Sequence, residues 1–323
     1  MFSDVVRALR QAERIAIFSH THPDGDAMGS AYALKLALCA IGKKAEVFLE
    51  PEHDREAWQL LYGKEACGLQ IADCDLLVAL DCADQARLNR YSGCFQAHGN
   101  TIALDHHVTH RPFAKNGTVV AEISSTCELL YGLLKEMGIP LTLEIANNLY
   151  IGIVSDTGNF KYSSVTPATH RVAAELLEYG VDFAAIAKAL FDTKTFGYLQ
   201  LLQTALSKLQ LYLDGTVAVL YLSEADFAAA QIDEQGAVGI VSLPNSVEGV
   251  EVGAYIRARG EGTFKVSLRS NTSVDVSAVA AAFGGGGHVR ASGYSASNTT
   301  VAQIIQSLLQ EIQNYEAKHE RSY

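Results

Sequence analysis

The amino-acid sequence predicts an α/β protein, with a larger N-terminal domain built on a mostly parallel sheet and a smaller C-terminal α+β domain. In the first half of the chain, short apolar segments typical of strands alternate with helical patterns, which favours a parallel sheet covered by helices. After about residue 208, strand-like segments are joined by turns such as Asp214-Gly215 and Gly260-Glu261-Gly262. With 323 residues, the chain is long enough for two domains that each bury a core.

Local patterns predict the individual elements. The helical pattern of residues 27–41 ends at Gly42, a residue type common just after a helix. Ser125 and Glu128 form a capping-box pattern that opens a helix ending near Met137. Strands are expected at residues 14–19, 44–49, 76–80 and 102–104. Further helices are expected at residues 4–12, 141–155, 167–179, 183–190 and 194–208. We expect domains over residues 1–190 and 209–323, joined by a helical connector over 191–208.

Composition and charge restrict the class of protein. Hydrophobic residues make up 49% and charged residues 19% of the chain, a balance typical of a folded globular protein. The N-terminus lacks the regions of a signal peptide, and no apolar segment reaches the roughly 18 residues of a membrane span. We expect a cytoplasmic protein without a membrane segment, whose six cysteines are reduced and mostly buried. The formal net charge of −11 argues against binding of long nucleic acid, but not against a short charged substrate.

The most informative segment is residues 19–30, which lies between an apolar strand and a helix. It contains His20, Asp24 and Asp26, and an open α/β sheet binds its ligand where a strand ends and a helix begins. The two aspartates are one residue apart with no Lys or Arg in the segment, so their charges repel unless a cation lies between them. We therefore expect a metal ion at this position.

Other acidic and imidazole side chains are expected at strand or helix ends. They are Asp81, Asp105, His106, His107 and Asp156. Three of the aspartates have a structural alternative, since Asp26 and Asp81 could cap helices and Asp156 could close a turn. The histidine pair could serve polar packing. The coincidence of all of them in an alternating α/β chain favours a metal site instead.

The ligand chemistry indicates the kind of ion and the kind of reaction. Carboxylates with some imidazole and no thiolate suit Mn²⁺ or Mg²⁺ better than zinc, iron or cobalt. So many ligands exceed the needs of one ion but suit two ions that share a carboxylate. Two-metal sites activate water and stabilise both the attacking and the leaving oxygen of a phosphoryl group, so phosphoester hydrolysis is the predicted reaction class.

A run of glycines at residues 284–287, followed by His288, is the unusual feature of the second half. Glycines let the backbone approach an anion closely and turn N–H groups towards it, with a flexible helix end as the structural alternative. Arg269 carries a planar fork suited to phosphate, with a solvated strand face as its alternative. Arg257 and Arg290 are weaker candidates for the same role.

Together these motifs resemble those of the DHH phosphoesterase superfamily. The motifs are His20-x-x-Pro23-Asp24-x-Asp26-Ala27-x-Gly29-Ser30, Asp81-Cys82-Ala83-Asp84, Asp105-His106-His107 and Ser155-Asp156-Thr157-Gly158. The glycine run with His288 and Ala291-Ser292-Gly293 resembles the signature of the associated DHHA1 domain. The resemblance covers nearly the whole chain. Within the superfamily, the chain is similar to the bifunctional oligoribonucleases (nanoRNases) that also act as phosphatases on 3′-phosphoadenosine 5′-phosphate (pAp).

The resemblance implies a role for each matching residue. The implied ligands of one metal are His20, Asp24 and Asp81, and those of the other are Asp26, Asp81, His106 and Asp156, with Asp81 bridging. The implied catalytic residues are His107, which would face the substrate phosphate, Asp81, and Asp105, which would orient its neighbour. The implied substrate-binding residues of the second domain are Arg269, Gly286, Gly287 and His288. His22 lies outside the pattern, and we do not expect it to be a ligand.

The resemblance also implies cofactors and partners. Two Mn²⁺ ions per chain are expected, with Mg²⁺ or Co²⁺ as substitutes, and the implied substrates are short RNA and mononucleotide bisphosphates such as pAp. A homodimer is compatible with the sequence.

Three other functions stay open at this point. The chain could hydrolyse cyclic or linear dinucleotides of the c-di-AMP or pApA type. It could be an inorganic pyrophosphatase or exopolyphosphatase, although the glycine run with His288 speaks against those substrates. It could also be an inactive nucleotide-binding regulator, although a pure binder gains nothing from crowded carboxylates.

Overall fold

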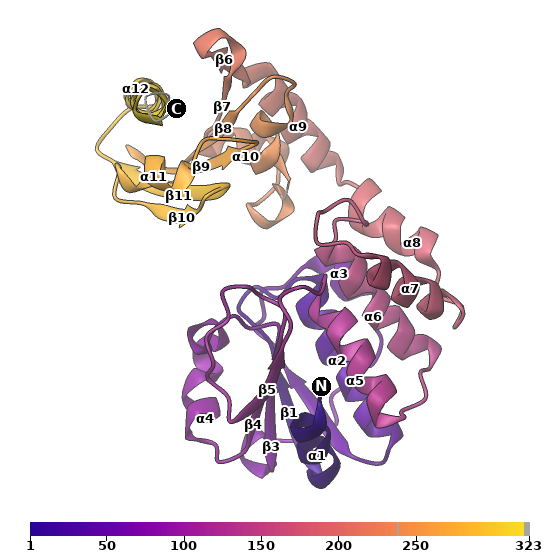
Figure 1. Ribbon diagram of the computed structural model, residues 1–323. Coiled ribbons are helices and arrows are strands. Elements are labelled where there is room, and N and C mark those ends of the chain that lie inside the picture. The colour runs from indigo at the N-terminus through magenta and orange to yellow at the C-terminus, as the bar shows by residue number, and fades with distance from the viewer. Residues whose placement is uncertain (238, 320–323) are drawn as a thin grey trace. The chain divides into compact units, whose positions relative to one another are not determined.

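The computed structural model describes residues 1–237 and 239–319 (Figure 1). Its internal contacts divide the chain into two units, the first formed by Met1–Thr193 and the second beginning at Lys194. Helix α9 (Phe196–Lys208), within the range predicted as a connector, is counted with the second unit. No helix in the described part of the chain is both long enough and apolar enough to span a membrane.

The first unit is built on a five-stranded sheet in which every neighbouring pair of strands is parallel, as the sequence predicted. Its strands, in the spatial order β2-β1-β3-β4-β5, are β2 (Lys44–Phe48), β1 (Arg14–Phe18), β3 (Leu76–Leu80), β4 (Thr101–Asp105) and β5 (Asn116–Val119). The three central strands are apolar, and β3 and β4 are buried along their whole length. The edge strand β5 was not predicted, because its sequence Asn-Gly-Thr-Val lacks an apolar strand pattern.

Helices cover both faces of this sheet, which explains why its central strands are largely apolar. Figure 1 shows α4 on one side of the sheet and α2, α5 and α6 on the other. On β1, Ile15 and Ile17 belong to the core under α2, α5 and α6, whereas Ala16 and Phe18 belong to a smaller core that contains Phe95 of α4. The helices are α1 (Ser3–Gln11), α2 (Gly25–Ala40), α3 (Arg55–Leu60), α4 (Ser92–Ala97), α5 (Thr126–Met137), α6 (Leu143–Asp156), α7 (Pro167–Leu177) and α8 (Phe183–Ala187), which continues into a π-helical turn at Lys188–Asp192.

Helix α2 begins two residues earlier than the sequence predicted. Asp24 is its N-cap, and one carboxylate oxygen accepts hydrogen bonds from the backbone N–H groups of Asp26 (3.0 Å) and Ala27 (3.1 Å). The alternative that Asp26 is the N-cap is therefore wrong, and Asp26 lies inside the first turn of the helix. The side chain of Asp26 does not cap α2 and lies fully buried.

The second unit contains a mixed six-stranded sheet in the order β10-β11-β9-β8-β7-β6. Its strands are β6 (Gln210–Tyr212), β7 (Val217–Leu222), β8 (Val252–Ala258), β9 (Thr263–Ser270), β10 (Gly286–His288) and β11 (Ala291–Ser297). Its other helices are α10 (Glu224–Ala230), α11 (Val276–Ala281) and α12 (Val301–His319). β7 and β8 pair in parallel and the other neighbours pair antiparallel, so the predicted α+β character is confirmed.

Both predicted hairpins form, but only one of them has the predicted turn. The β8–β9 hairpin forms as expected, and Gly260 and Gly262 both have positive φ in its turn. The two-residue turn predicted at Asp214-Gly215 is wrong, because Tyr212 pairs with Val217 and four residues lie between them. Leu213 joins Asp214 and Gly215 in positive φ, which lengthens the turn.

Only the first part of the glycine run, residues 284–285, follows a helix end, because the rest belongs to a strand. Helix α11 ends at Ala281, and the last two glycines begin the edge strand β10, in which Gly287 pairs with Ser292 of β11. A Cβ atom on Gly285 would collide with the carbonyl oxygen of Gly293, and one on Gly287 would lie 2.6 Å from the carbonyl oxygen of Ala291. Close packing against β11 thus requires glycine at these positions, independently of any bound anion.

Glycine at position 29 allows α2 to pack closely against α6. A Cβ atom at this position would lie 2.5 Å from the backbone carbonyl oxygen of Asn148. We expect Gly29→Ala to lower the free energy of unfolding by about 1–3 kcal/mol, because this helix backbone cannot withdraw without disturbing the core. Urea denaturation followed by circular dichroism measures the change.

Gly93→Ala is the matched control, since Gly93 lies on the exposed helix α4 and a Cβ atom there would meet nothing within 4 Å. The control should gain about 0.5–1 kcal/mol from reduced backbone entropy of the unfolded chain. Equal stability changes in the two variants would contradict the packing argument.

Candidate metal centre

The C-terminal ends of three adjacent parallel strands and the end of one helix bring the predicted ligands together. His20 follows β1, Asp81 follows β3, and His106 follows β4, while Asp156 is the last residue of α6. Because β1, β3 and β4 are neighbours in the sheet, their carboxyl ends meet at the same edge. Asp24 and Asp26 join them from the start of α2.

The potential ligand atoms of the described residues form three groups, which are His20, Asp24 and Asp81, then Asp26, His106 and Asp156, and finally Asp81, His106 and His107, which shares a residue with each of the others. In the first group, His20 Nε2 is 3.5 Å from Asp81 Oδ2 and 4.0 Å from Asp24 Oδ2. In the second, His106 Nε2 is 3.2 Å from Asp156 Oδ2 and 3.9 Å from Asp26 Oδ2. Asp81 contacts both of these groups, because its other oxygen, Oδ1, is 3.5 Å from His106 Nε2.

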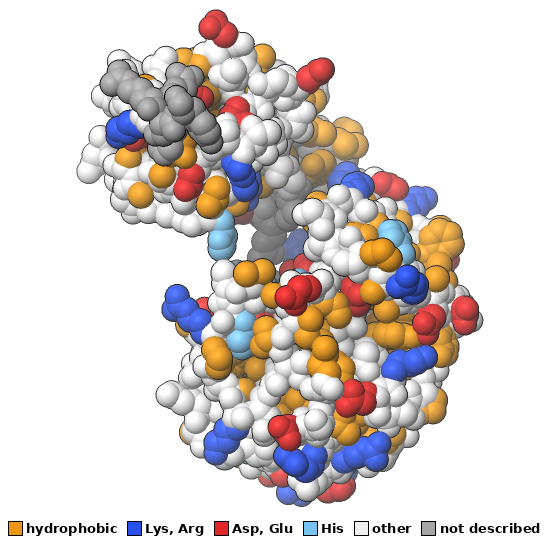
Figure 2. Space-filling view, viewed as in Figure 1, with side chains coloured by type: hydrophobic (Ala, Val, Ile, Leu, Met, Phe, Trp, Pro, Cys, Tyr) orange, Lys and Arg blue, Asp and Glu red, His pale blue; other side chains and the backbone are white. Residues whose placement is uncertain are grey.

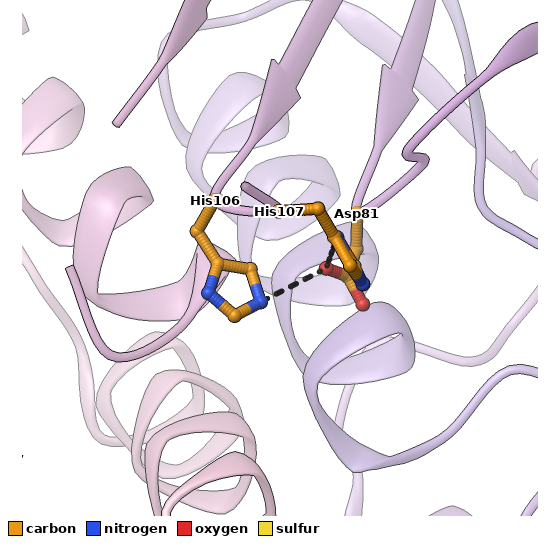
Figure 3. Close-up of side chains that lie close together, drawn as sticks. All are labelled: Asp81, His106 and His107. Atoms are coloured by element: carbon orange, nitrogen blue, oxygen red, sulfur yellow. Dashed lines mark ion pairs between the residues drawn. The ribbon is translucent and has the colours of Figure 1, made fainter. Parts of the chain in front are cut away.

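His107 approaches the same oxygen of Asp81, Oδ1, as His106 does (Figure 3). Its Nδ1 is 3.6 Å from Asp81 Oδ1 but only 2.7 Å from Asp105 Oδ1. The hydrogen bond to Asp105 therefore occupies Nδ1 and leaves Nε2 free, on a side chain that is 32% exposed. This bond raises the pKa of His107, although burial opposes the shift.

Asp105 is fully buried and accepts a hydrogen bond on each of its oxygens. The second donor is His110, whose Nδ1 lies 2.6 Å from Asp105 Oδ2. Burial alone would raise the pKa of Asp105, but the bonds from His107 and His110 outweigh it and hold the pKa below its usual value. His110 was not identified from the sequence as a partner of Asp105. The one feature of the sequence that could have indicated it is a third histidine three residues after the pair.

The N-terminus of α5 holds two buried carboxylates of the cluster, those of Asp26 and Asp81. The backbone N–H groups of Thr126 and Cys127 donate to the two oxygens of Asp26 at 2.7 and 2.9 Å. The hydroxyl of Thr126 donates to Asp81 Oδ1 at 3.0 Å. Asp81 also has a positive φ of 58°, a backbone conformation that side chains rarely adopt. The sequence predicted this helix start but not its role, because Asp26 and Thr126 are 100 residues apart.

Within the described part of the chain, the carboxylates of the cluster have no lysine or arginine as an ion-pair partner. Among the described residues, histidines are the only basic side chains in ion pairs with Asp24, Asp26, Asp81 and Asp156. Burial and the charges of Asp81 and Asp24 raise the pKa of Asp156 to about 7. Burial, Asp81 and Asp156 also raise the pKa of Asp26 well above its usual value. A cation among these oxygens would relieve the repulsion.

The donor atoms fit a hard divalent metal. Carboxylate oxygens with two imidazoles match the preferences of Mn²⁺ and Mg²⁺. Two cysteines lie close to the carboxylates, but burial raises the pKa of both Cys82 and Cys127 well above its usual value, so they are neutral thiols rather than thiolate ligands. His22 is exposed and pairs with Glu52 at 3.2 Å, and it belongs to none of the groups of potential ligand atoms found among the described residues.

Two of the four predicted substrate-binding residues of the second unit, Arg269 and Gly286, line a surface hollow of about 380 Å³. It is lined in part by Arg269, Lys265, Ser267 and Gly286. Gly287 is not among the lining residues, and His288 is exposed on the neighbouring edge strand. Lys265 was not predicted as a substrate-binding residue. It precedes Arg269 by four residues on β9, so both side chains lie on the same face of the sheet.

The two weaker arginine candidates have structural partners. Arg257 forms an ion pair with Glu234. Arg290 donates to the hydroxyl of Ser270 at 3.3 Å and to the carbonyl oxygen of Val274 at 3.1 Å. Both side chains therefore stabilise the second unit.

The fold and the two motif-bearing units define the class of protein. Residues 14–153 match the DHH family, N-terminal domain, and residues 214–318 match the DHHA1 domain. The chain belongs to the DHH family of phosphoesterases, whose members depend on metal ions.

Two relatives of similar length carry a specific name. A bifunctional oligoribonuclease and PAP phosphatase NrnA from Thermus thermophilus is 33% identical over 304 residues, covering 92% of this chain and 89% of the relative. The protein of the same name from Bacillus subtilis is 25% identical over 300 residues, covering 91% and 93%.

Solved structures share the fold. An exopolyphosphatase-related protein from Bacteroides fragilis is 27% identical, with a TM-score of 0.87 over 98% of this chain and 96% of that one. A RecJ from Thermus thermophilus in complex with Mn²⁺ is 16% identical, with a TM-score of 0.56 over 98% of this chain and 54% of that one, which indicates a common fold only.

The raised carboxyl pKa values predict how pH and metal affect stability. A folded-state pKa of about 7 for Asp156 means that the folded protein keeps a proton that the unfolded chain has released above about pH 4. The metal-free protein should therefore lose stability as the pH rises from about 4 to about 7. Mn²⁺ should raise the melting temperature more at about pH 8 than at about pH 6, because the ligands must lose protons to bind it.

Differential scanning fluorimetry with EDTA or with a fixed Mn²⁺ concentration, across this pH range, measures both effects. Asp156→Asn is the control, since it should flatten the pH dependence of the metal-free protein. A Mn²⁺-induced shift that is independent of pH would contradict the electrostatic argument.

Proposed function

We propose that this protein is a two-metal phosphoesterase that hydrolyses short oligoribonucleotides and pAp. The observation that carries the proposal is the position of Asp81, with Oδ2 3.5 Å from His20 Nε2 and Oδ1 3.5 Å from His106 Nε2. One carboxylate facing two ligand groups is the arrangement that a pair of ions requires. The names of the relatives from Thermus thermophilus and Bacillus subtilis support the choice of substrates.

The proposed ligands of the two ions are the following. One ion is held by His20, Asp24 and Asp81, and the other by Asp26, Asp81, His106 and Asp156. We propose Mn²⁺ for both, with Mg²⁺ or Co²⁺ as substitutes, because the donors are mostly carboxylate oxygens with one imidazole in each group. When bound, such ions supply a water nucleophile at neutral pH and neutralise charge on the phosphoryl oxygens.

The protein's own groups orient the substrate and provide a proton. The hydrogen bond from Nδ1 to Asp105 directs the other ring nitrogen of His107 away from that buried carboxylate. From there Nε2 can bind a phosphoryl oxygen and donate a proton to the leaving oxygen. The N–H groups of Thr126 and Cys127 keep Asp26 in place, so that its oxygens need not reorganise during the reaction.

The second unit would bind the part of the substrate that does not react. Arg269 and Lys265 supply positive charge at the hollow on β9 and β11, and Gly286 leaves room for a ligand to approach the backbone. We assign a second phosphate or the base to this surface, with Gly287 and His288 beside it. A homodimer and a cytoplasmic location stay predictions from the sequence.

Short substrates are favoured by the charge of the protein. The formal net charge is −11, and the face of the first unit visible in Figure 2 carries interspersed acidic and basic side chains rather than a basic groove. At this net charge a long strand gains little from counterion release, and each added phosphate meets an unfavourable potential. Affinity then depends on a few local contacts to the end of the substrate.

Replacing Asp81 tests the two-metal site. Asp81→Asn should remove the shared charge and lower turnover of pAp by on the order of a thousandfold or more. Asparagine is the preferred replacement because it tolerates the left-handed backbone at this position. Turnover is measured as phosphate release under saturating Mn²⁺, and bound metal is measured by mass spectrometry.

Asp75→Asn is the matched control, because Asp75 flanks the other end of β3 and its carboxylate accepts hydrogen bonds only from the backbone N–H groups of Glu13 and Arg14 among the described residues. This variant should keep its metals and its turnover. Near-normal activity of the Asp81→Asn variant would contradict the two-metal assignment.

Substrate length tests the proposed specificity. Labelled RNAs of two, three, five and 24 nucleotides should be cleaved at falling rates, with the 24-mer much slower than the dinucleotide. Raising the salt concentration should narrow the gap by screening the repulsion. Parallel assays of pAp, a cyclic dinucleotide, pyrophosphate and polyphosphate separate the other functions. Rates that rise with length would point to a processive exonuclease, and turnover of the inorganic substrates alone would point to a polyphosphatase.

A further inference from the structure

Asp105 binds two histidines, and only one of them has a place in the proposed reaction. Its Oδ1 accepts from His107 at 2.7 Å, and its Oδ2 accepts from His110 at 2.6 Å. We propose that His110 is a positioning residue, which holds Asp105 in the orientation that keeps His107 directed at the substrate. This inference rests on the proposed role of His107 in phosphoester hydrolysis.

Burial makes the second hydrogen bond necessary. The carboxylate of Asp105 is 0% exposed and the ring of His110 is 8% exposed, so water has little access to either. A buried carboxylate oxygen without a partner costs several kcal/mol or takes up a proton. His110 is the only donor to Oδ2 found among the described residues, so its loss would leave that oxygen without a protein partner.

The local structure holds His110 in place. Its backbone N–H donates to the carbonyl oxygen of His107 at 3.1 Å, which closes a turn between the two histidines. Its ring lies beside Phe113, with ring centroids 5.7 Å apart. The positions of both imidazoles relative to Asp105 are therefore set by one short segment.

The carboxylate of Asp81 also lies close enough to His107 to compete with Asp105 for its ring. Nδ1 of His107 is 2.7 Å from Asp105 Oδ1 and 3.6 Å from Asp81 Oδ1. If Asp105 rotated, His107 could turn to Asp81, which would withdraw its free nitrogen from the substrate and occupy an oxygen proposed to bind metal. By satisfying Oδ2, His110 keeps Oδ1 directed at His107.

Two variants at position 110 separate positioning from packing. His110→Phe keeps a ring beside Phe113 but removes the donor. His110→Asn restores a donor, because its amide nitrogen, like Nδ1 of histidine, is bonded to Cγ. We expect His110→Phe to lower kcat about 10–100-fold with KM changed less than twofold and with metal content unchanged, and His110→Asn to recover most of kcat.

The control variant is His98→Phe. Nδ1 of His98 is also hydrogen-bonded, 2.7 Å from the carbonyl oxygen of Asn100, but His98 precedes β4 instead of following it. Its replacement should affect the melting temperature without a comparable loss of kcat. Nitrogen-15 spectra of the metal-free protein give a readout besides activity: His107 should carry its proton on Nδ1 in the wild type and in His110→Asn, and lose this preference in His110→Phe.

The assays use pAp and bis(p-nitrophenyl) phosphate, a phosphodiester that needs no nucleotide recognition. If the wild type cleaves only the latter, the proposed substrates are wrong, and His110 is still tested on the remaining reaction. Wild-type kcat in His110→Phe, equal losses in the Phe and Asn variants, or loss of metal in parallel with activity would each overturn the positioning role. Should His110→Phe fail to fold, His110→Ala removes the same donor, and the same outcomes apply.

Discussion

The structure depends on holding four aspartate carboxylates together at one edge of a sheet. Two unit charges about 4 Å apart repel by about 4 kcal/mol at the effective dielectric of a protein surface. Several such pairs approach the whole stability of a typical domain, about 5–15 kcal/mol. Asp24, Asp26, Asp81 and Asp156 can therefore stay charged in the folded protein only where hydrogen bonds or a cation offset their repulsion.

The chain meets this requirement to a different extent at each carboxylate. Asp26 receives two backbone N–H groups from the start of α5, and Asp81 receives the Thr126 hydroxyl and is close to three histidines. Asp156 has only His106 among its described ion-pair partners, and its pKa is raised to about 7. Asp156 is thus a carboxylate whose charge at neutral pH depends on a bound cation, as is that of Asp26, whose pKa is also raised.

The glycines serve packing as well as chemistry. Gly29 lets α2 approach α6, and so places Asp26 and Asp156, which lie on these two helices, at the same edge of the sheet. In the second unit, Gly285 and Gly287 let the edge strand β10 pair closely with β11. Gly286, by contrast, has open space above its Cα and lines the hollow beside Arg269, so it is the glycine of the run with room for a ligand.

The sequence by itself determined the strands of the first unit, except β5, and the residues that follow them. Apolar segments of strand type and the acidic or imidazole residues at their ends are local patterns, and parallel topology makes those ends meet. The tertiary structure alone decided the contacts between distant segments, such as the N–H groups of Thr126 and Cys127 on Asp26 and the bond from His110 to Asp105. It also decided that Asp24 rather than Asp26 caps α2, and that the turn after β6 has four residues. These features depend on which atoms come within hydrogen-bonding distance after folding, and no local pattern of residue types encodes that distance.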